Sequence, residues 1–198
     1  MNATDRLQQQ LSFLAAADGL KTVERRSRLA DDSRLENSAE HSWHVALYAL
    51  VLAEYALERV DAGRVVKMLL VHDLVEVEAG DTYVYDPAGL ATKLEREQAA
   101  ATRIFGLLPE AQGADLRSLW EEFEARATPD ARFANAMDRL SPVLLNRTNQ
   151  GRSWRSHGVV AEQVRAVNSV VGDAAPQLGD VVRAVIDEAV REGWIEGA

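Results

Sequence analysis

The chain has 198 residues, of which 47% are hydrophobic, and a formal net charge of -9 at pH 7. This length supports one domain with a substantial core, and the negative charge disfavours nucleic acids and anionic membranes as partners. The absence of cysteine excludes disulfides and thiolate metal sites. Because neither a signal-peptide pattern nor an apolar run of membrane-spanning length is found, we expect a cytoplasmic protein.

The first half of the sequence has the periodicity of helices. Leucines at 7, 11 and 14 predict a first helix that stops near Gly19. A short helix or turn is expected at 20–28, followed by a polar loop. Asn37 and Glu40 form a capping-box pattern, which predicts a helix from there to about residue 61. A further helix is expected from about 64 to 78. The expected apolar face of the 37–61 helix carries Trp43, Leu47, Leu50, Val51 and Leu57.

The second half continues the helical pattern. Helices are expected at about 91–106, around the apolar stripe of residues 116–123, and from Thr128-Pro129 to about 146, where Pro142 favours a kink. Two more follow the loop at 149–158, and no strand pair is expected. The predicted fold is all-α, with seven to nine helices in a single domain (1–198). Its motif-bearing core covers about 20–148, and the C-terminal helices at 159–192 pack on that core.

An unusual polar pair lies inside an apolar helix pattern. His72 and Asp73 follow Val66-Lys-Met-Leu-Leu-Val, and a buried charge is costly unless it is paired or bound to a metal. Adjacent helical residues point about 100° apart, yet both can reach one ion at a groove between helices. Asp138 interrupts another apolar helix in the same way. A lone polar residue of this kind is more often part of the core, but the combination indicates mixed nitrogen and oxygen ligation of a divalent metal.

Three segments carry a family resemblance. AEHSWHVA (39–46), LLVHDLVEVEAGD (69–81) and AMDRL (136–140) resemble the HD-domain metal-dependent phosphohydrolase superfamily. The similarity is greatest to its bacterial 5'-deoxynucleotidase branch and the related human HD-domain-containing family. The resemblance implies an α-helical bundle that holds one divalent ion (Mn, Co, Ni, Fe, Zn or Mg), and it implies a homodimer.

The same resemblance assigns residues to the metal. It implies that the ligands are His41, His72, Asp73 and Asp138. His41 is chosen because it stands in the family's Glu-His-Ser pattern. Helical geometry would also allow His44, three residues further on, to reach the ion. We expect His44 to pack beside the ligands instead.

Two acids follow the His-Asp pair. Glu76 lies one helical turn after His72 and matches the family's proposed catalytic acid, which would assist a metal-activated water. Asp81 matches a second acid near the sugar or leaving oxygen. Glu78 is expected to be a solvated residue at the helix end.

Phosphate binding requires positive charge, and arginines precede the first motif. Counted back from that motif, Arg26 aligns with the family's phosphate-contacting arginine, whose guanidinium suits phosphate oxygens. Arg25 and Arg28 are expected to be ordinary loop residues, and Lys93 is a weaker candidate for phosphate. The bacterial nucleotidases carry Arg-Trp where this sequence has Arg26-Ser27, so selection of 2'-deoxy sugars by that tryptophan is not expected.

These features predict a phosphomonoesterase that releases phosphate from nucleoside 5'-monophosphates. Two alternatives stay open: a triphosphate or phosphodiester hydrolase of the same superfamily, and a non-catalytic helical module with a structural metal. The presence of both Glu76 and Asp81 favours catalysis, because a structural metal site does not require them. The loop at 149–158, with Trp154 and His157, either closes over the site or is a packed loop.

Overall fold

The computed structural model describes residues 3–197 and confirms the all-α fold class. In this part of the chain one antiparallel pair of strands accompanies the helices: β1 (Glu24–Arg28) and β2 (Leu35–Asn37). Short 3₁₀ turns are η1 (Asp18–Thr22) and η2 (Ala53–Tyr55). The α-helices are α1 (Ala3–Ala17), α2 (Ser38–Leu52), α3 (Ala62–Val71), α4 (Glu76–Ala79), α5 (Pro87–Phe105), α6 (Glu110–Ala125), α7 (Pro129–Thr148), α8 (Arg152–Ser156), α9 (Ala161–Ala174) and α10 (Pro176–Arg191).

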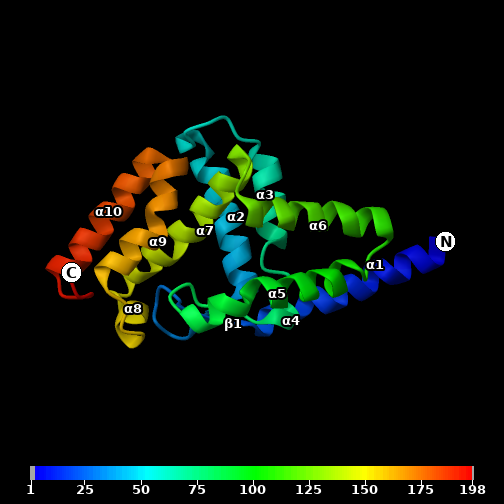
Figure 1. Cartoon of the computed structure of the whole chain (residues 1–198), viewed down its shortest axis with the longest axis horizontal. Helices are drawn as coiled ribbons and strands as arrows, with labels where there is room; N and C mark the ends of the chain where they lie inside the picture. Colours follow the sequence, from blue (N-terminus) through cyan, green and yellow to red (C-terminus); the bar gives the residue numbers. More distant parts are fainter. Residues whose placement is uncertain (1–2, 198) are drawn as a thin grey trace.

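The helices surround two clusters of buried apolar side chains. Helices α2, α3 and α7 occupy the middle of the molecule, with α8–α10 at one end and α1, α5 and α6 at the other (Figure 1). Met68 and Leu69 belong to the first cluster, together with side chains of α2, α7, α9 and α10. Leu74 and Val75 belong to the second, together with side chains of α1, α5 and α6. Val71 already belongs to the second cluster, so the chain passes from one core to the other just before His72 and Asp73.

The short antiparallel ribbon contradicts the expectation that the chain has no strand pair. The short helix or turn expected at 20–28 is confined to η1, which ends at Thr22, and β1 follows it. Glu24 pairs with Asn37 and Arg28 with Leu35, with an irregular register between them. Strands of this kind are missed because charged residues replace the usual alternation of apolar and polar side chains. The ribbon is stabilised by backbone pairing and by the ion pair of Arg25 with the buried Glu36.

The predicted helix at 64–78 is interrupted at the His-Asp pair. Helix α3 ends at Val71, and α4 begins at Glu76. Between them the amide of Leu74 donates to the carbonyl of Val71 (3.2 Å), and that of Glu76 donates to the carbonyl of Asp73 (2.9 Å). Such i to i+3 bonds wind the chain more tightly than an α-helix and align side chains three residues apart. Asp73 and Glu76 are thereby brought to the same side.

The apolar face predicted for α2 is wrong. Trp43 and Val51 are each 63% exposed, and the other three members of that face are exposed as well. The helix also ends at Leu52, earlier than expected. Its buried face consists of small or polar side chains, which allow a close approach to α3 and α7: Ser38, His41, Ser42, Val45, Ala46 and Ala49. The expected stripe of the first helix, Leu7, Leu11 and Leu14, is also exposed.

Helix α7 starts as predicted, and the C-terminal helices pack on it. The hydroxyl of Thr128 accepts the amide of Ala131 (3.1 Å), and Pro129 occupies the first helical position. The helix continues through Pro142. The predicted loop at 149–158 contains the short helix α8, and α9 contacts both α7 and α10 extensively. Among residues 3–197, none of the helices combines the length and the hydropathy that crossing a membrane requires.

The capping box at the start of α2 provides a test of local stability. The Asn37 side chain accepts the amide of Glu40 (2.9 Å), and the Glu40 carboxylate accepts the amide of Asn37 (3.3 Å). Replacing Asn37 by Ala removes the cap and should cost about 1 kcal/mol of unfolding free energy, or about 2–4 °C in Tm. Asn37→Asp keeps the acceptor and should stay near the wild type in thermal and denaturant unfolding. Equal losses in the two variants would contradict a capping role.

Candidate metal centre and active site

His72 is held with one ring nitrogen directed at the acidic residues. Its Nδ1 lies 2.7 Å from the carbonyl oxygen of Leu69. A carbonyl can only accept, so Nδ1 carries a proton, and in the neutral imidazole the lone pair is on Nε2. Nε2 is buried without a hydrogen bond, 3.1 Å from Asp73 and 3.8 Å from Asp138. This hydrogen bond to the backbone orients the His72 ring in the same way that such bonds orient metal-binding histidines.

His41 lies in the same cluster, from α2. Its ring is fully buried, and its Nε2 is 2.8 Å from Oδ1 of Asp138 on α7. Its Nδ1 faces the carboxylate of Glu36 at 3.5 Å. The two imidazoles are 5.7 Å apart between ring centroids. Helices α2 and α7 therefore bring His41 and Asp138 to the turn that carries His72 and Asp73.

Arg25 is the cation at the centre of this group, in contrast to the expectation of an ordinary loop residue. Its Nη1 lies 3.0 Å from Asp73 and 3.7 Å from Asp81, and its Nε lies 3.6 Å from Glu36. Arg26 was favoured in the sequence because, counted back from the first motif, it aligns with the family's phosphate-contacting arginine. On a strand, neighbouring side chains point to opposite faces, so Arg25 points inward whereas Arg26 is exposed.

The cluster holds more negative than positive charge. Carboxylates act on Arg25 from Glu36, Asp73, Glu76, Asp81 and Asp138. Burial disfavours the charged guanidinium, but these acids, Asp73 foremost, raise the pKa of Arg25 above its usual range. For His72, burial again disfavours the charge, while Asp73 and Asp138 raise the pKa to about 9. Both shifts have one cause, an excess of buried carboxylates that attracts cations.

Glu76 is a buried acid beside the metal-ligand candidates. Burial raises the pKa of Glu76 well above its usual range, and the neighbouring Asp73 adds to this effect. The hydroxyl of Ser38 donates to its Oε2 at 2.6 Å. A carboxylate in such surroundings binds a proton more readily than one at the surface, as a general base in hydrolysis must.

Asp81 reaches the cluster through a sharp turn after α4. Gly80 has φ +73°, a conformation that favours glycine. Its amide caps α4 by donating to the backbone carbonyl of Glu76. Arg96 of α5 then fixes the segment by donating to the carbonyl of Ala79 and the hydroxyl of Thr82. Burial raises the pKa of Asp81, and Arg25 partly offsets that effect.

The donor set fits a divalent ion. His41, His72 and Asp73 each offer a ligand atom within 4.8 Å of the others, and Asp138 adjoins both imidazoles. Two nitrogens with carboxylate oxygens are typical ligands of first-row divalent metals. The hydrogen-bond-free Nε2 of His72 and the surplus of buried negative charge would both be satisfied by such an ion.

Other candidates lie apart from these ligands. The ring of His44 packs 5.7 Å from that of Trp43 and 4.6 Å from that of Tyr48. Glu78 is exposed and pairs with Arg103, as a solvated residue would. The ammonium of Lys93 lies 3.1 Å from Glu97 and 3.3 Å from Glu124. These two carboxylates hold the ammonium between α5 and α6, and Lys93 does not line the pocket beside the metal-ligand candidates. The geometry therefore does not favour Lys93 as a phosphate ligand.

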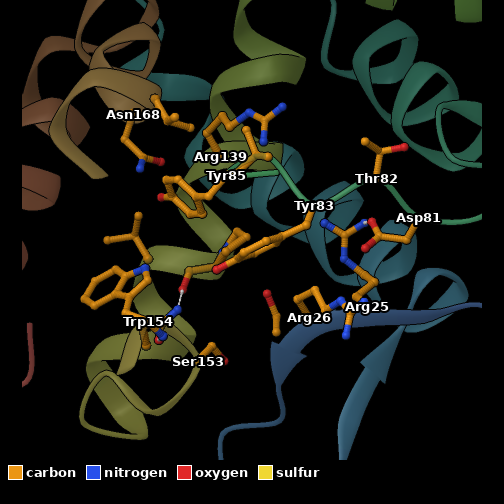
Figure 2. A pocket seen from close by; sticks show the side chains of 16 residues that line it. Arg25, Arg26, Asp81, Thr82, Tyr83, Tyr85, Arg139, Ser153, Trp154 and Asn168 are labelled. Atoms are coloured by element: carbon orange, nitrogen blue, oxygen red, sulfur yellow. Dashed lines mark hydrogen bonds and ion pairs between the residues drawn. The ribbon is translucent and has the colours of Figure 1, made fainter. Parts of the chain in front are cut away.

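A pocket opens next to the cluster. Arg25, Arg26, Ser27 and Asp81 line one part of it, and the pocket extends to α7, α8 and α9 (Figure 2). The space beside these residues amounts to about 580 Å³ when the part that is open to solvent is counted. A small molecule bound there would therefore touch the guanidinium and carboxylate groups at the edge of the proposed metal centre.

The profile of the HD domain family matches residues 17–179. The chain belongs to this family. A solved structure described as a "Predicted metal-dependent phosphohydrolase" from Magnetospirillum magnetotacticum MS-1 is 50% identical, with a TM-score of 0.92 over 96% of each chain. The HD domain implies a divalent metal, and the cluster described above supplies residues suited to it.

Two curated relatives are more distant. The human 5'-deoxynucleotidase HDDC2 is 32% identical over 135 residues, which are 68% of this chain and 65% of that protein. The zebrafish (Danio rerio) 5'-deoxynucleotidase HDDC2 is 29% identical over 68% of this chain and 66% of its own length. The match thus spans just under two thirds of the length of these relatives.

Metal binding should depend on pH through His72. With a pKa of about 9 in the metal-free protein, the imidazole is protonated at neutral pH and must lose that proton to become a ligand. Apparent affinity for Mn²⁺ should therefore rise about tenfold per pH unit between pH 6 and 8. Calorimetric titrations in buffers of different ionisation enthalpy would measure both the affinity and the proton released. His44→Gln should keep the wild-type slope, whereas a pH-independent affinity would contradict the assignment of His72.

Proposed function

We propose that this HD-domain protein is a metal-dependent phosphomonoesterase acting on nucleoside 5'-monophosphates. The observation that carries the proposal is the buried cluster of two histidines and surplus carboxylates, placed beside a pocket lined by Arg25, Arg26 and Arg139. The names of the human and zebrafish relatives support the choice of a nucleotide. Assembly as a homodimer and a cytoplasmic location stay predictions.

The proposed ligands are His41, His72, Asp73 and Asp138. When bound, a single divalent ion supplies Lewis-acid chemistry, which activates water and withdraws charge from a phosphoryl group. The ring of His44 packs against Trp43 and Tyr48, so His44 is not offered as a further histidine ligand, which supports a single ion.

Four side chains of the protein bind the phosphate and transfer protons. Arg25, at the border of cluster and pocket, neutralises the phosphate and fixes its orientation. Arg26 adds a second guanidinium from the solvent side of the pocket. Glu76 accepts the proton of the attacking water, because its buried carboxylate has a raised pKa and faces Asp73. Asp81 lines the pocket and delivers a proton to the departing alcohol, for which its raised pKa suits it.

A substrate panel with a ligand variant tests the function. The purified protein, with Mn²⁺, Co²⁺, Ni²⁺, Zn²⁺ or Mg²⁺, should release inorganic phosphate from nucleoside 5'-monophosphates faster than from triphosphates or phosphodiesters. Asp73→Ala removes a proposed ligand and should reduce both bound metal and phosphate release to background. Phosphate release at the wild-type rate from Asp73→Ala would overturn the proposed metal site. Preference for the triphosphates or diesters would overturn the substrate class.

The role of Glu76 has a matched control two residues away. Glu76→Gln keeps the shape and a partner for Ser38 but cannot accept a proton. We expect kcat to fall by about 10²- to 10⁴-fold, with the metal content of the protein unchanged. Glu78→Gln, at an exposed position on the same helix, should retain wild-type kcat. If the two variants behave alike in a steady-state assay, Glu76 is not the proton acceptor.

A further inference from the structure

The pocket continues well beyond the proposed phosphate position. Arg25 and Asp81 lie on one side of the close-up view, while Trp154 and Asn168 lie on the other, with Tyr83 and Tyr85 between them (Figure 2). The far wall comes from α7, α8 and α9. These residues lie away from Arg25 and Asp81, where we place the phosphate, so they face the group that the phosphate is attached to.

The wall is rich in aromatic rings. Tyr83 and Tyr85 meet edge to face with centroids 5.2 Å apart, and Tyr83 is 4.8 Å from the ring of His157. Trp154, in the middle of α8, is buried. Burial raises the pKa of Tyr85 to about 12, so that its phenol is neutral at physiological pH. Neutral aromatic faces of this kind favour planar rings as partners.

Polar groups from α7 and α9 complete the wall. The side chain of Asn168 is buried, and its Nδ2 donates a hydrogen bond to the carbonyl of Val164 (2.8 Å). Arg139 lines the same pocket, and its Nε lies 3.7 Å from Asp138. A fixed amide and a guanidinium beside aromatic faces can form hydrogen bonds to the edge of a heterocyclic ring.

We propose that this part of the pocket binds the purine or pyrimidine ring of the substrate, stacked on Tyr83 with its edge toward Asn168 and Arg139. The proposal rests on the proposed function, because it identifies the departing alcohol as a nucleoside. It also gives the C-terminal helices a role: α8 and α9 complete the substrate site that the HD motifs begin.

The test compares a nucleotide with an ester that lacks the base. Deoxyadenosine 5'-monophosphate and 2-deoxyribose 5-phosphate share the phosphate and the sugar. Wild type should have the higher kcat/KM on the nucleotide. In Tyr83→Ala, this value should fall about 10- to 100-fold, chiefly through KM, while that for the base-free ester changes less than about threefold. Tyr55→Ala, which removes an exposed tyrosine on η2, should leave both values unchanged.

A binding measurement separates this proposal from the catalytic one. Deoxyadenosine itself carries no phosphate, and saturation-transfer NMR should show contact of its base protons with wild type and Tyr55→Ala but not with Tyr83→Ala. Absence of phosphate release from every ester would overturn the proposed function while this contact still supports a base pocket. Absence of the contact, or equal losses on both esters in Tyr83→Ala, would overturn the base pocket.

Discussion

The structure depends on a local imbalance of charge in its interior. Five carboxylates approach Arg25 where the chain passes between two hydrophobic cores. Burying this many acids around few cations is unfavourable unless a further positive charge joins them. A divalent ion supplies that charge, and the orientation of His72 by a backbone carbonyl leaves a nitrogen free to bind it. The arrangement therefore has the electrostatics of a binding site whose ligand is a cation.

The surrounding elements hold the residues of this cluster in position. The tight turn between α3 and α4 aligns Asp73 with Glu76, so that a ligand and a proton acceptor share one side. The ribbon points Arg25 and Glu36 inward, and Ser38 at the start of α2 donates to Glu76. Because α2 presents small side chains to α3 and α7, His41 and Asp138 can approach within 2.8 Å. Elements far apart in the sequence thus converge on one point.

Much of this could be predicted from sequence. Helical periodicity predicted most of the helices, and polar residues that interrupt apolar runs indicated His72, Asp73 and Asp138. The choice of His41 over His44 came from the family resemblance. The predictions that were wrong concerned features that tertiary contacts determine. The ribbon has no apolar alternation, so its pairing and the inward direction of Arg25 could not be read from residue types. The faces of α1 and α2 were misassigned because leucine and tryptophan were taken as buried, whereas α2 buries alanine, serine and histidine instead.

The central claim is that His41, His72, Asp73 and Asp138 share one divalent ion. Anomalous diffraction from crystals grown with Mn²⁺ tests it most directly. The account predicts a single strong peak per protein chain, at bonding distance of about 2.0–2.2 Å from both imidazoles and from oxygens of Asp73 and Asp138. A peak on His44, or a cluster without any peak at saturating Mn²⁺, would contradict it.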